Sequence, residues 1–266
     1  MKTESGQKIV IIGCGNLAWH LAKHLSSTKK FQIYVYNHKA SKALSEFKTK
    51  LNCNTVDTLS EIITDAAFYF LCVPDRAIKK TSKLIMRTKG LVIHCSGSKS
   101  IEELKAKNKA VLYPLQTFSK EDTINWKDIP LLIEANSESN EKQIKQLAFL
   151  FSNQIILLNS AERLKLHLAA VLVNNFTNAL YAEADKFISE NVKAKAINFN
   201  LLLPLINQTN LKLGRLSPKE AQTGPAKRND KEVMKQHLAL LNNNKELKKL
   251  YKQLSKLIEH QQNAHA

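Results

Sequence analysis

Glycine is scarce in this sequence, with 7 residues in a chain of 266. Average usage is about 7%, so a collagen-like chain, a glycine-rich linker and a low-complexity chain are all excluded. Glycine is the default residue where the backbone turns tightly or approaches another group closely. The few positions where it occurs are therefore informative.

Long apolar runs are also missing. The nearest candidate for a membrane span, residues 166–182, is interrupted by five polar residues, and the strand-like run at residues 9–12 is too short for the apolar core of a signal peptide. We therefore expect no membrane span, no secretory signal and a cytoplasmic protein.

The four cysteines lie far apart in the sequence. They form no Cys-x-x-Cys pair and no Cys/His pattern with the spacing of zinc ligands, so no metal site is predicted. Free cysteines behave as small apolar residues and are mostly buried. We expect reduced, buried thiols at Cys14, Cys53, Cys72 and Cys95.

Acidic residues are outnumbered, 23 against 40 Lys and Arg, which gives a formal net charge of +17. Such a charge suits nucleic acid, a membrane surface or an anionic small molecule. The aromatic content of 7%, the dispersed lysines and the lack of a nucleic-acid-binding motif argue against nucleic acid. The most basic stretch, residues 231–266, mixes 7 Lys with 3 Glu and is typical of a solvated helix face.

The first part of the sequence alternates short apolar runs with amphipathic stretches. We expect strands at residues 8–12, 31–36, 67–73, 91–95, 111–113, 130–134 and 154–158, and helices at 17–25, 41–51, 78–87, 101–107 and 141–151. Short apolar runs between helices indicate strands that are buried on both faces. The predicted fold class is α/β, with an N-terminal Rossmann domain built on a doubly wound parallel sheet.

The second part of the sequence changes character. After about residue 160 no strand-like run occurs, and we expect helices at residues 161–189, 201–213, 232–241 and 245–259. We therefore predict two domains, an α/β domain at residues 1–158 and an all-α domain at residues 159–266.

Two of the seven glycines stand together between the first predicted strand and the first predicted helix. Gly13, Gly15 and Ala18 form the pattern G-x-G-x-x-A, with Asn16 and Leu17 between them. The first glycine permits a tight turn, the second lets the backbone approach a pyrophosphate, and the small third residue lets the helix pack on the strand. The helix N-terminus then offers free N–H groups to phosphates. The pattern predicts dinucleotide binding, and an ordinary tight turn is the alternative.

The end of the second predicted strand indicates which dinucleotide is bound. NAD sites usually have an Asp or Glu there, which binds the ribose 2′-hydroxyl. This sequence has Asn37, His38 and Lys39 instead, and Lys39 would attract a 2′-phosphate. NADP(H) is therefore favoured over NAD(H), and solvated surface side chains are the alternative.

Two further strand ends would face the same cofactor, because ligands of open α/β sheets bind beyond the carboxyl ends of the strands. Cys72, Val73 and Pro74 end one predicted strand, and Ser96 and Gly97 follow the next. We expect both segments to contact the nicotinamide half.

A histidine on the long predicted helix is the candidate acid or base. His167 and Asn174 are seven residues apart and so share a face of an ideal α-helix. The pKa of histidine suits proton transfer at neutral pH. A hydrogen-bonded core histidine is the alternative.

Two loops supply candidate substrate contacts. Gln116 and Thr117 follow a proline in a turn and could bind a polar substrate, or serve only as loop residues. Gly224 interrupts the helical pattern and suggests a backbone shape that only glycine adopts easily. Arg228 then offers a guanidinium fork to a carboxylate or phosphate.

Five segments together make the sequence similar to the 6-phosphogluconate-dehydrogenase-like superfamily: KIVIIGCGNLAWHLA, NHK, FLCVPD, HCSGS and YPLQTFS. Within it, the sequence resembles the Rossmann-like proteins with a C-terminal domain of unknown function, which are related to pyrroline-5-carboxylate reductase and to NADP- or deazaflavin-dependent oxidoreductases. Residues 167–171, 174–176 and 223–230 resemble the signatures of that second domain.

The resemblance implies an NADP-binding domain at residues 1–158 and a helical substrate and dimerisation domain at residues 159–266, with a substrate cleft between them. It adds Asn175 to the substrate contacts and implies a homodimer. The related β-hydroxyacid dehydrogenases carry a catalytic lysine four residues before an asparagine, where this sequence has Ala170 before Asn174 and Val171 before Asn175. Alcohol oxidation through that lysine is therefore in doubt, but pyrroline-5-carboxylate reductases lack the lysine too.

The sequence thus predicts an NADP(H)-dependent oxidoreductase that transfers hydride to or from a small anionic imine or carbonyl substrate. A dinucleotide-binding sensor or regulatory protein without hydride transfer is the alternative. Nucleic-acid binding is the third and weakest interpretation.

Overall fold

The computed structural model describes residues 6–194 and 196–263. The chain divides into two compact units, residues 1–173 and 174–266. The last strand of the first unit ends at Leu157, beside the domain boundary that we predicted at residue 158, and the helix that follows, α5 (Ser160–Ala170), still belongs to the first unit.

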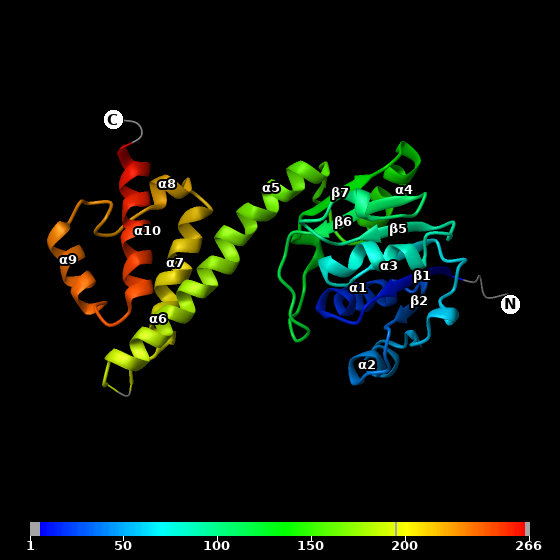
Figure 1. Cartoon of the computed structure of the whole chain (residues 1–266), viewed down its shortest axis with the longest axis horizontal. Coiled ribbons are helices and arrows are strands. Elements are labelled where there is room, and N and C mark those ends of the chain that lie inside the picture. Colours follow the sequence, from blue (N-terminus) through cyan, green and yellow to red (C-terminus); the bar gives the residue numbers. More distant parts are fainter. Residues whose placement is uncertain (1–5, 195, 264–266) are drawn as a thin grey trace. The chain divides into compact units, whose positions relative to one another are not determined.

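The first unit contains an eight-stranded sheet with the order β3-β2-β1-β4-β5-β6-β7-β8 (Figure 1). In chain order the strands are β1 (Gln7–Ile12), β2 (Phe31–Tyr36), β3 (Asn54–Val56), β4 (Phe68–Leu71), β5 (Leu91–His94), β6 (Lys109–Pro114), β7 (Leu131–Ala135) and β8 (Ile155–Leu157). Neighbouring strands are parallel except β6 and β7. The Rossmann sheet that the sequence predicts is confirmed.

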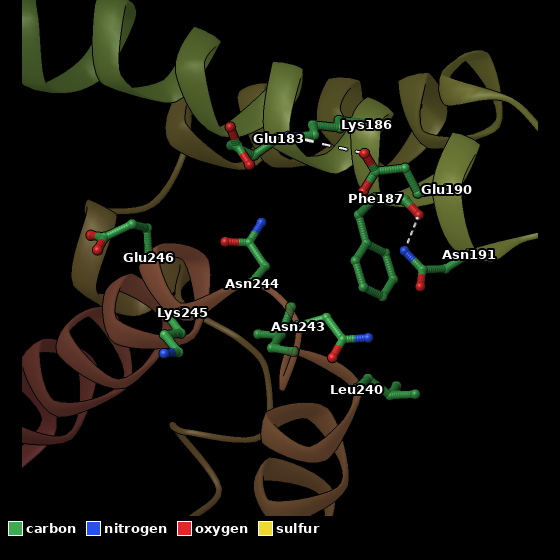
Figure 2. A pocket seen from close by; sticks show the side chains of 11 residues that line it. Glu183, Lys186, Phe187, Glu190, Asn191, Leu240, Asn243, Asn244, Lys245 and Glu246 are labelled. Carbon is green, nitrogen blue, oxygen red and sulfur yellow. Dashed lines mark hydrogen bonds and ion pairs between the residues drawn. The ribbon is translucent and has the colours of Figure 1, made fainter.

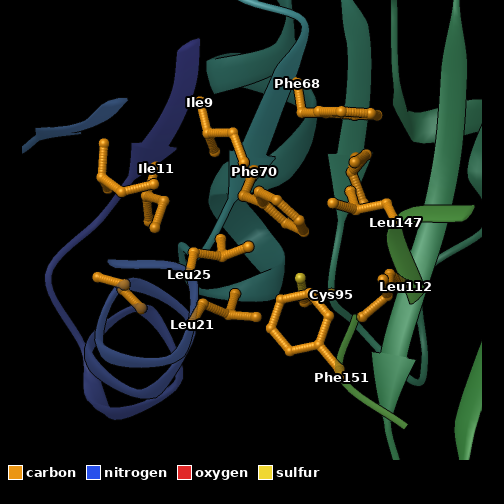
Figure 3. Packing of buried hydrophobic residues seen from close by; sticks show 14 of the residues in the cluster. Ile9, Ile11, Leu21, Leu25, Phe68, Phe70, Cys95, Leu112, Leu147 and Phe151 are labelled. Carbon is orange, nitrogen blue, oxygen red and sulfur yellow. The ribbon is translucent and has the colours of Figure 1, made fainter. Parts of the chain in front are cut away.

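Helices cover both faces of this sheet, as the apolar strands require. Ile9 and Ile11 of β1 face one core cluster, which also contains side chains of α1 (Asn16–Ser27), α2 (Lys42–Leu51) and α4 (Glu138–Ala148). Figure 3 shows part of this cluster around Phe70, Leu112 and Phe151. Val10 and Ile12 face the opposite cluster, which contains Ile78 of α3 (Ile78–Leu84).

The sheet changes its winding direction at β1. This strand lies between β2 and β4, so the chain runs outward to one side through β2 and β3 and to the other side through β4 and β5. Such a switch point leaves a crevice at the carboxyl ends of the two central strands, which is where open α/β sheets bind ligands.

The second unit is entirely helical in its described residues. After α6 (Thr177–Asn191) come the helices α7 (Leu203–Leu213), α8 (Pro218–Ala221), α9 (Lys231–Leu240) and α10 (Lys245–Asn263). Among those residues only Ala226, Leu241 and Ser255 are buried, each with 7–8% of its surface exposed. Many of its leucines are exposed instead, among them Leu201, Leu205, Leu211 and Leu240.

Four details differ from the prediction. β3 is three residues long and begins at an asparagine, too short and too polar to be recognised. The helix expected at residues 101–107 is a single 3-10 turn, Ile101–Glu103, because the backbone is extended at Leu104. The segment between β6 and β7 forms no crossover helix, so β7 runs antiparallel to β6. A π-helix, Val171–Phe176, interrupts the helix predicted at residues 161–189.

Candidate dinucleotide and proton-transfer site

The turn between β1 and α1 is fixed against the end of β4. The N–H group of Gly13 donates a hydrogen bond to the carbonyl oxygen of Tyr36 at 2.8 Å. The φ angle of Gly13 is +112°, which is unfavourable for a residue with a side chain. A Cβ atom at Gly13 would lie 2.2 Å from the carbonyl oxygen of Cys72. The first glycine of the pattern therefore serves the close approach of two backbone segments.

Gly15 has a different environment. It is the N-cap of α1, with φ −78°, and a Cβ atom there would meet nothing within 4 Å. No side chain caps the helix and no acidic residue lies in its first turn. The free N–H groups and the positive end of the helix dipole therefore face open space, as a pyrophosphate site requires. These residues fit a dinucleotide.

A cavity of about 290 Å³ opens at this helix end, within the first unit. Its wall consists of Gly15, Asn16, Leu17, Ala18, Leu71, Cys72, Val73, Pro74, Asp75, Cys95 and Ser96. The structure thus brings together eight of the predicted cofactor residues from three chain segments. Ala18 is completely buried, so the small residue lets α1 pack on the sheet as expected.

Asn16 has a structural contact in addition. Its side-chain N–H donates to the carbonyl oxygen of Phe118 at 2.8 Å, and a ring nitrogen of His20 lies 2.7 Å from the carbonyl oxygen of Ser119. Both contacts hold the loop after β6 against α1. Gln116 and Thr117 lie in that loop, exposed, and the side-chain oxygen of Gln116 accepts the N–H of Thr117 at 2.8 Å.

The segment after β2 carries the predicted recognition of the 2′-phosphate. The N–H of Asn37 donates to the carbonyl oxygen of Val56 at 3.1 Å, and its side-chain N–H donates to the carbonyl oxygen of Lys39 at 2.9 Å. Asn37 therefore stabilises the turn, while the side chains of His38 and Lys39 are exposed. These residues do not line the cavity at Gly15.

The loops after β4 and β5 are joined by polar contacts. The hydroxyl of Ser98 donates to a carboxylate oxygen of Asp75 at 2.5 Å, and the N–H of Ser98 donates to the hydroxyl oxygen of Ser96 at 3.1 Å. The N–H of Ser96 donates to Nδ1 of His94 at 3.2 Å. Burial, with the nearby charge of Arg163, lowers the pKa of His94 to about 4. His94 is therefore neutral at neutral pH and shapes the loop.

Tyr113 and His167 meet beside these loops. The Tyr113 hydroxyl oxygen lies 3.1 Å from Nδ1 of His167. A Cβ atom at Gly97 would lie 2.6 Å from that nitrogen and 2.7 Å from Cζ of Tyr113, so only glycine leaves room for the pair. Burial and the charge of Asp75 raise the pKa of Tyr113. Tyr113 is not among the site residues predicted from the sequence, although its place at the end of a predicted strand was a signal.

A buried ion pair fixes the helix that carries His167. Arg163 is 1% exposed and forms an ion pair with Glu134 of β7. Its guanidinium also donates to the carbonyl oxygen of Lys99 at 2.5 Å. Ser160, at the start of α5, donates to Glu134 at 2.8 Å. This network is not predicted from the sequence, because its members lie far apart in the chain.

The remaining predicted residues lie in the second unit. Asn174 and Asn175 are exposed in the π-helix, whose hydrogen bonds connect residues five apart. The 3.6-residue spacing that placed Asn174 on the face of His167 therefore does not apply. Gly224 has φ +108°, which confirms the predicted need for glycine, and its carbonyl oxygen accepts the N–H of Arg228 at 3.3 Å. The Arg228 side chain is exposed.

A larger cavity of about 690 Å³ lies within the helical unit (Figure 2). Its wall mixes charged and amide side chains of α6 and of the turn before α10, with Lys186 and Glu190 at 4.0 Å and the Asn191 side chain donating to the carbonyl oxygen of Phe187 at 2.9 Å. It has no glycine turn and no strand end. Its size alone does not make it the functional site.

Two features are absent from the described residues. Within residues 6–194 and 196–263 no helix has both the length and the apolar character needed to cross a bilayer. In the same part of the chain no three His, Cys, Asp or Glu side chains are grouped so that they could hold a metal ion.

The chain is similar to known protein families along most of its length. Residues 8–98 match the family described as "NADP oxidoreductase coenzyme F420-dependent", and residues 129–258 match a domain of unknown function, DUF2520. No curated protein matches the sequence. A candidate NADP oxidoreductase from Bacteroides fragilis is 34% identical, with 97% of this chain and 100% of that chain covered and a TM-score of 0.87.

More distant structures share the fold. A pyrroline-5-carboxylate reductase from Coxiella burnetii is 18% identical, with 98% of both chains covered and a TM-score of 0.56. A reductive aminase from Aspergillus terreus, solved with NADPH and ethyl-5-oxohexanoate, is 11% identical, with 94% of this chain and 93% of that chain covered and a TM-score of 0.68.

The chain belongs to the family of two-domain proteins that join an N-terminal domain of the NADP oxidoreductase type to a DUF2520 domain. The resemblance stated from the sequence is thereby confirmed. The prediction of NADP(H) as cofactor agrees with these family descriptions.

The two glycines of the turn should respond differently to substitution. We expect Gly13→Ala to lower the free energy of unfolding by about 2–5 kcal/mol, through its positive φ and the clash with Cys72. Gly15→Ala should lower the free energy of unfolding by no more than about 1 kcal/mol, the typical loss when alanine replaces a favourable N-cap residue. Urea unfolding followed by tryptophan fluorescence measures both, because Trp19 and Trp126 lie in the core of the first unit. Equal losses would contradict this assignment.

Proposed function

We propose that the protein is an NADP(H)-dependent oxidoreductase that acts on a small anionic imine or carbonyl compound. The observation that carries the proposal is the open helix end at Gly15, beside a second strand that ends without an acidic residue. When bound, the cofactor supplies or accepts the hydride.

Three segments of the first unit would bind the dinucleotide. The N–H groups at Gly15, Asn16 and Leu17 would hold the pyrophosphate at the positive end of α1. Lys39, with His38 beside it, would pair with the 2′-phosphate. The loops at residues 72–74 and 96–97 would form the walls around the nicotinamide, at the switch point of the sheet.

Tyr113 and His167 would supply the proton. If Nδ1 of His167 carries a hydrogen and donates it to the phenolic oxygen, the Tyr113 hydroxyl proton is free for a substrate oxygen or nitrogen, and the N–H stabilises the phenolate that remains. The raised pKa of Tyr113 keeps the hydroxyl protonated before reaction, as a general acid requires. The substrate contacts at Gln116, Thr117, Asn175, Gly224 and Arg228 stay predictions, as does the catalytic role of Asn174.

The helical unit would pair with a second copy of the chain. Its few buried residues and its exposed leucines leave an apolar surface that a monomer rarely presents. One groove of about 460 Å³ between α6 and α10 is lined by Leu180, Phe187, Ile188, Leu247 and Tyr251, among others. A symmetric homodimer covers such a surface on both partners at once.

Cofactor binding tests the central proposal. We expect NADPH to bind more tightly than NADH, and Gly15→Asp to abolish binding because the carboxylate occupies the phosphate position. Lys39→Ala should weaken the binding of NADPH by roughly 10- to 100-fold, which corresponds to the free energy of one charge-assisted hydrogen bond. The affinity for NADH should stay nearly unchanged. The exposed Lys48→Ala serves as control. Cofactor fluorescence measures each Kd, and no binding of either nucleotide would overturn the proposal.

Proton transfer is tested separately from binding. Tyr113→Phe should lower kcat on a panel of cyclic imines, 2-oxo acids and aldehydes by about 10²- to 10⁴-fold, while the Kd for NADPH stays within a factor of about two. Gly97→Ala should reduce kcat too, because its methyl group separates Tyr113 from His167. Full activity of Tyr113→Phe would exclude it as the acid. NADPH binding by the native chain without turnover of any compound would favour the sensor alternative.

The assembly is tested by light scattering. One chain has a mass of 30.1 kDa, so a dimer should scatter as about twice that mass. Leu201 and Leu205 of the helical unit are 60% and 67% exposed. We expect the double variant Leu201→Glu/Leu205→Glu to weaken association. Gln208→Glu adds charge at a polar exposed position of α7 and is the control. A native chain that stays monomeric at micromolar concentration would refute the homodimer.

A further inference from the structure

Two cysteines lie side by side at the carboxyl edge of the sheet. Cys72 follows β4 and Cys95 follows β5, and these strands are parallel with Leu71 opposite His94. Each cysteine directly follows one of these paired residues in the chain, so the two cysteines lie opposite each other at the ends of the two strands. Neighbouring strands lie about 4.8 Å apart, within the Cα separations of about 4.4–6.8 Å that disulfides span.

The two side chains also point to the same side of the sheet. Both belong to the core cluster under α1, where Cys95 is buried and Cys72 is partly buried. Figure 3 shows Cys95 within this cluster, with its sulfur among the apolar side chains. Both cysteines line the cavity that opens at Gly15. The two thiols are therefore close enough to form a disulfide, and a small reagent can reach them through the cavity.

The two thiols differ in environment. Cys95 shares a hydrogen bond with Cys72, and this contact, with burial, raises the pKa of Cys95 well above its usual value. Cys72 is the more accessible of the two thiols. The positive end of α1 borders the same cavity and favours a thiolate there. The carboxylate of Asp75, which also lines the cavity, opposes it.

We propose that Cys72 and Cys95 are a dithiol site that closes reversibly to an intramolecular disulfide in the floor of the cavity. The Cys72 thiol gives its proton to solvent, and the thiolate attacks one sulfur of a small organic disulfide; the S–S bond of the reagent breaks, the expelled thiolate takes a proton from solvent, and a mixed disulfide is left on Cys72. Cys95 then gives its proton to solvent and attacks the Cys72 sulfur, which expels the second thiol. The two protein thiols are oxidised by two electrons and the reagent is reduced to two thiols.

The bridge would change the cavity itself. It ties the segment before Pro74 to the segment before Ser96, and both segments form the cavity wall. If the dinucleotide binds there, which rests on the proposed function, it covers the thiols, and the bridge weakens its binding. Formation of the bridge does not depend on that function.

The test treats the full chain with 2-hydroxyethyl disulfide and maps the products by mass spectrometry. Trypsin leaves Cys53 and Cys72 in one peptide, residues 51–76, so Cys53→Ser is the working background. We expect the loss of two hydrogen atoms and a link between residues 51–76 and 90–99. Cys95→Ser should stop at a mixed disulfide on Cys72, and Cys72→Ser or Cys72→Ala should form no link.

Cofactor protection is measured on the same samples. NADPH at about ten times its Kd should slow the reaction roughly tenfold, because about one chain in eleven is then free. A folded chain that forms no bridge, or one that links Cys14 instead, would overturn the proposal. Bridge formation at an unchanged rate with NADPH bound would place the thiols outside the cofactor site. Failure of NADPH to bind would refute the proposed function and leave the dithiol site standing.

Discussion

The contact between the backbone of the β1–α1 turn and the carbonyl oxygen of Cys72 governs the arrangement of the candidate dinucleotide site. Because Gly13 has no side chain, the turn reaches the end of β4 and holds the start of α1 above it. The free N–H groups of α1 then face the same cavity as the loops after β4 and β5. A side chain at this position would push the helix away from the strands that complete the site.

The parts of this arrangement that depend on local pattern could be predicted from the sequence. Short apolar runs such as residues 8–12 and 67–73 indicated buried parallel strands, and the glycines between a strand and a helix indicated the phosphate turn. Even Gly224, isolated in a helical sequence, signalled a positive φ that the structure shows. In each case the information lies within a few neighbouring residues.

The parts that depend on pairing between distant segments could not be predicted. Tyr113 meets His167 across 54 residues, and Glu134 meets Arg163 across 29, and neither pair leaves a pattern in a single sequence. The π-helix at residues 171–176 changes hydrogen-bond spacing without a change in apolar pattern. Gly97 illustrates the same limit, because its need for glycine comes from two side chains far away in the chain.

The shortage of buried residues in the helical unit has a thermodynamic consequence. Ordering each residue costs about 1–2 kcal/mol in conformational entropy, and a unit with three buried residues in its described part offsets little of that by itself. Its helices then owe much of their stability to whatever covers their exposed leucines. Where that cover is another molecule, the fraction of chains with an ordered helical unit becomes a function of protein concentration. Dilution, rather than heat, would then be the mildest way to unfold the helical third of this protein while the sheet stays intact.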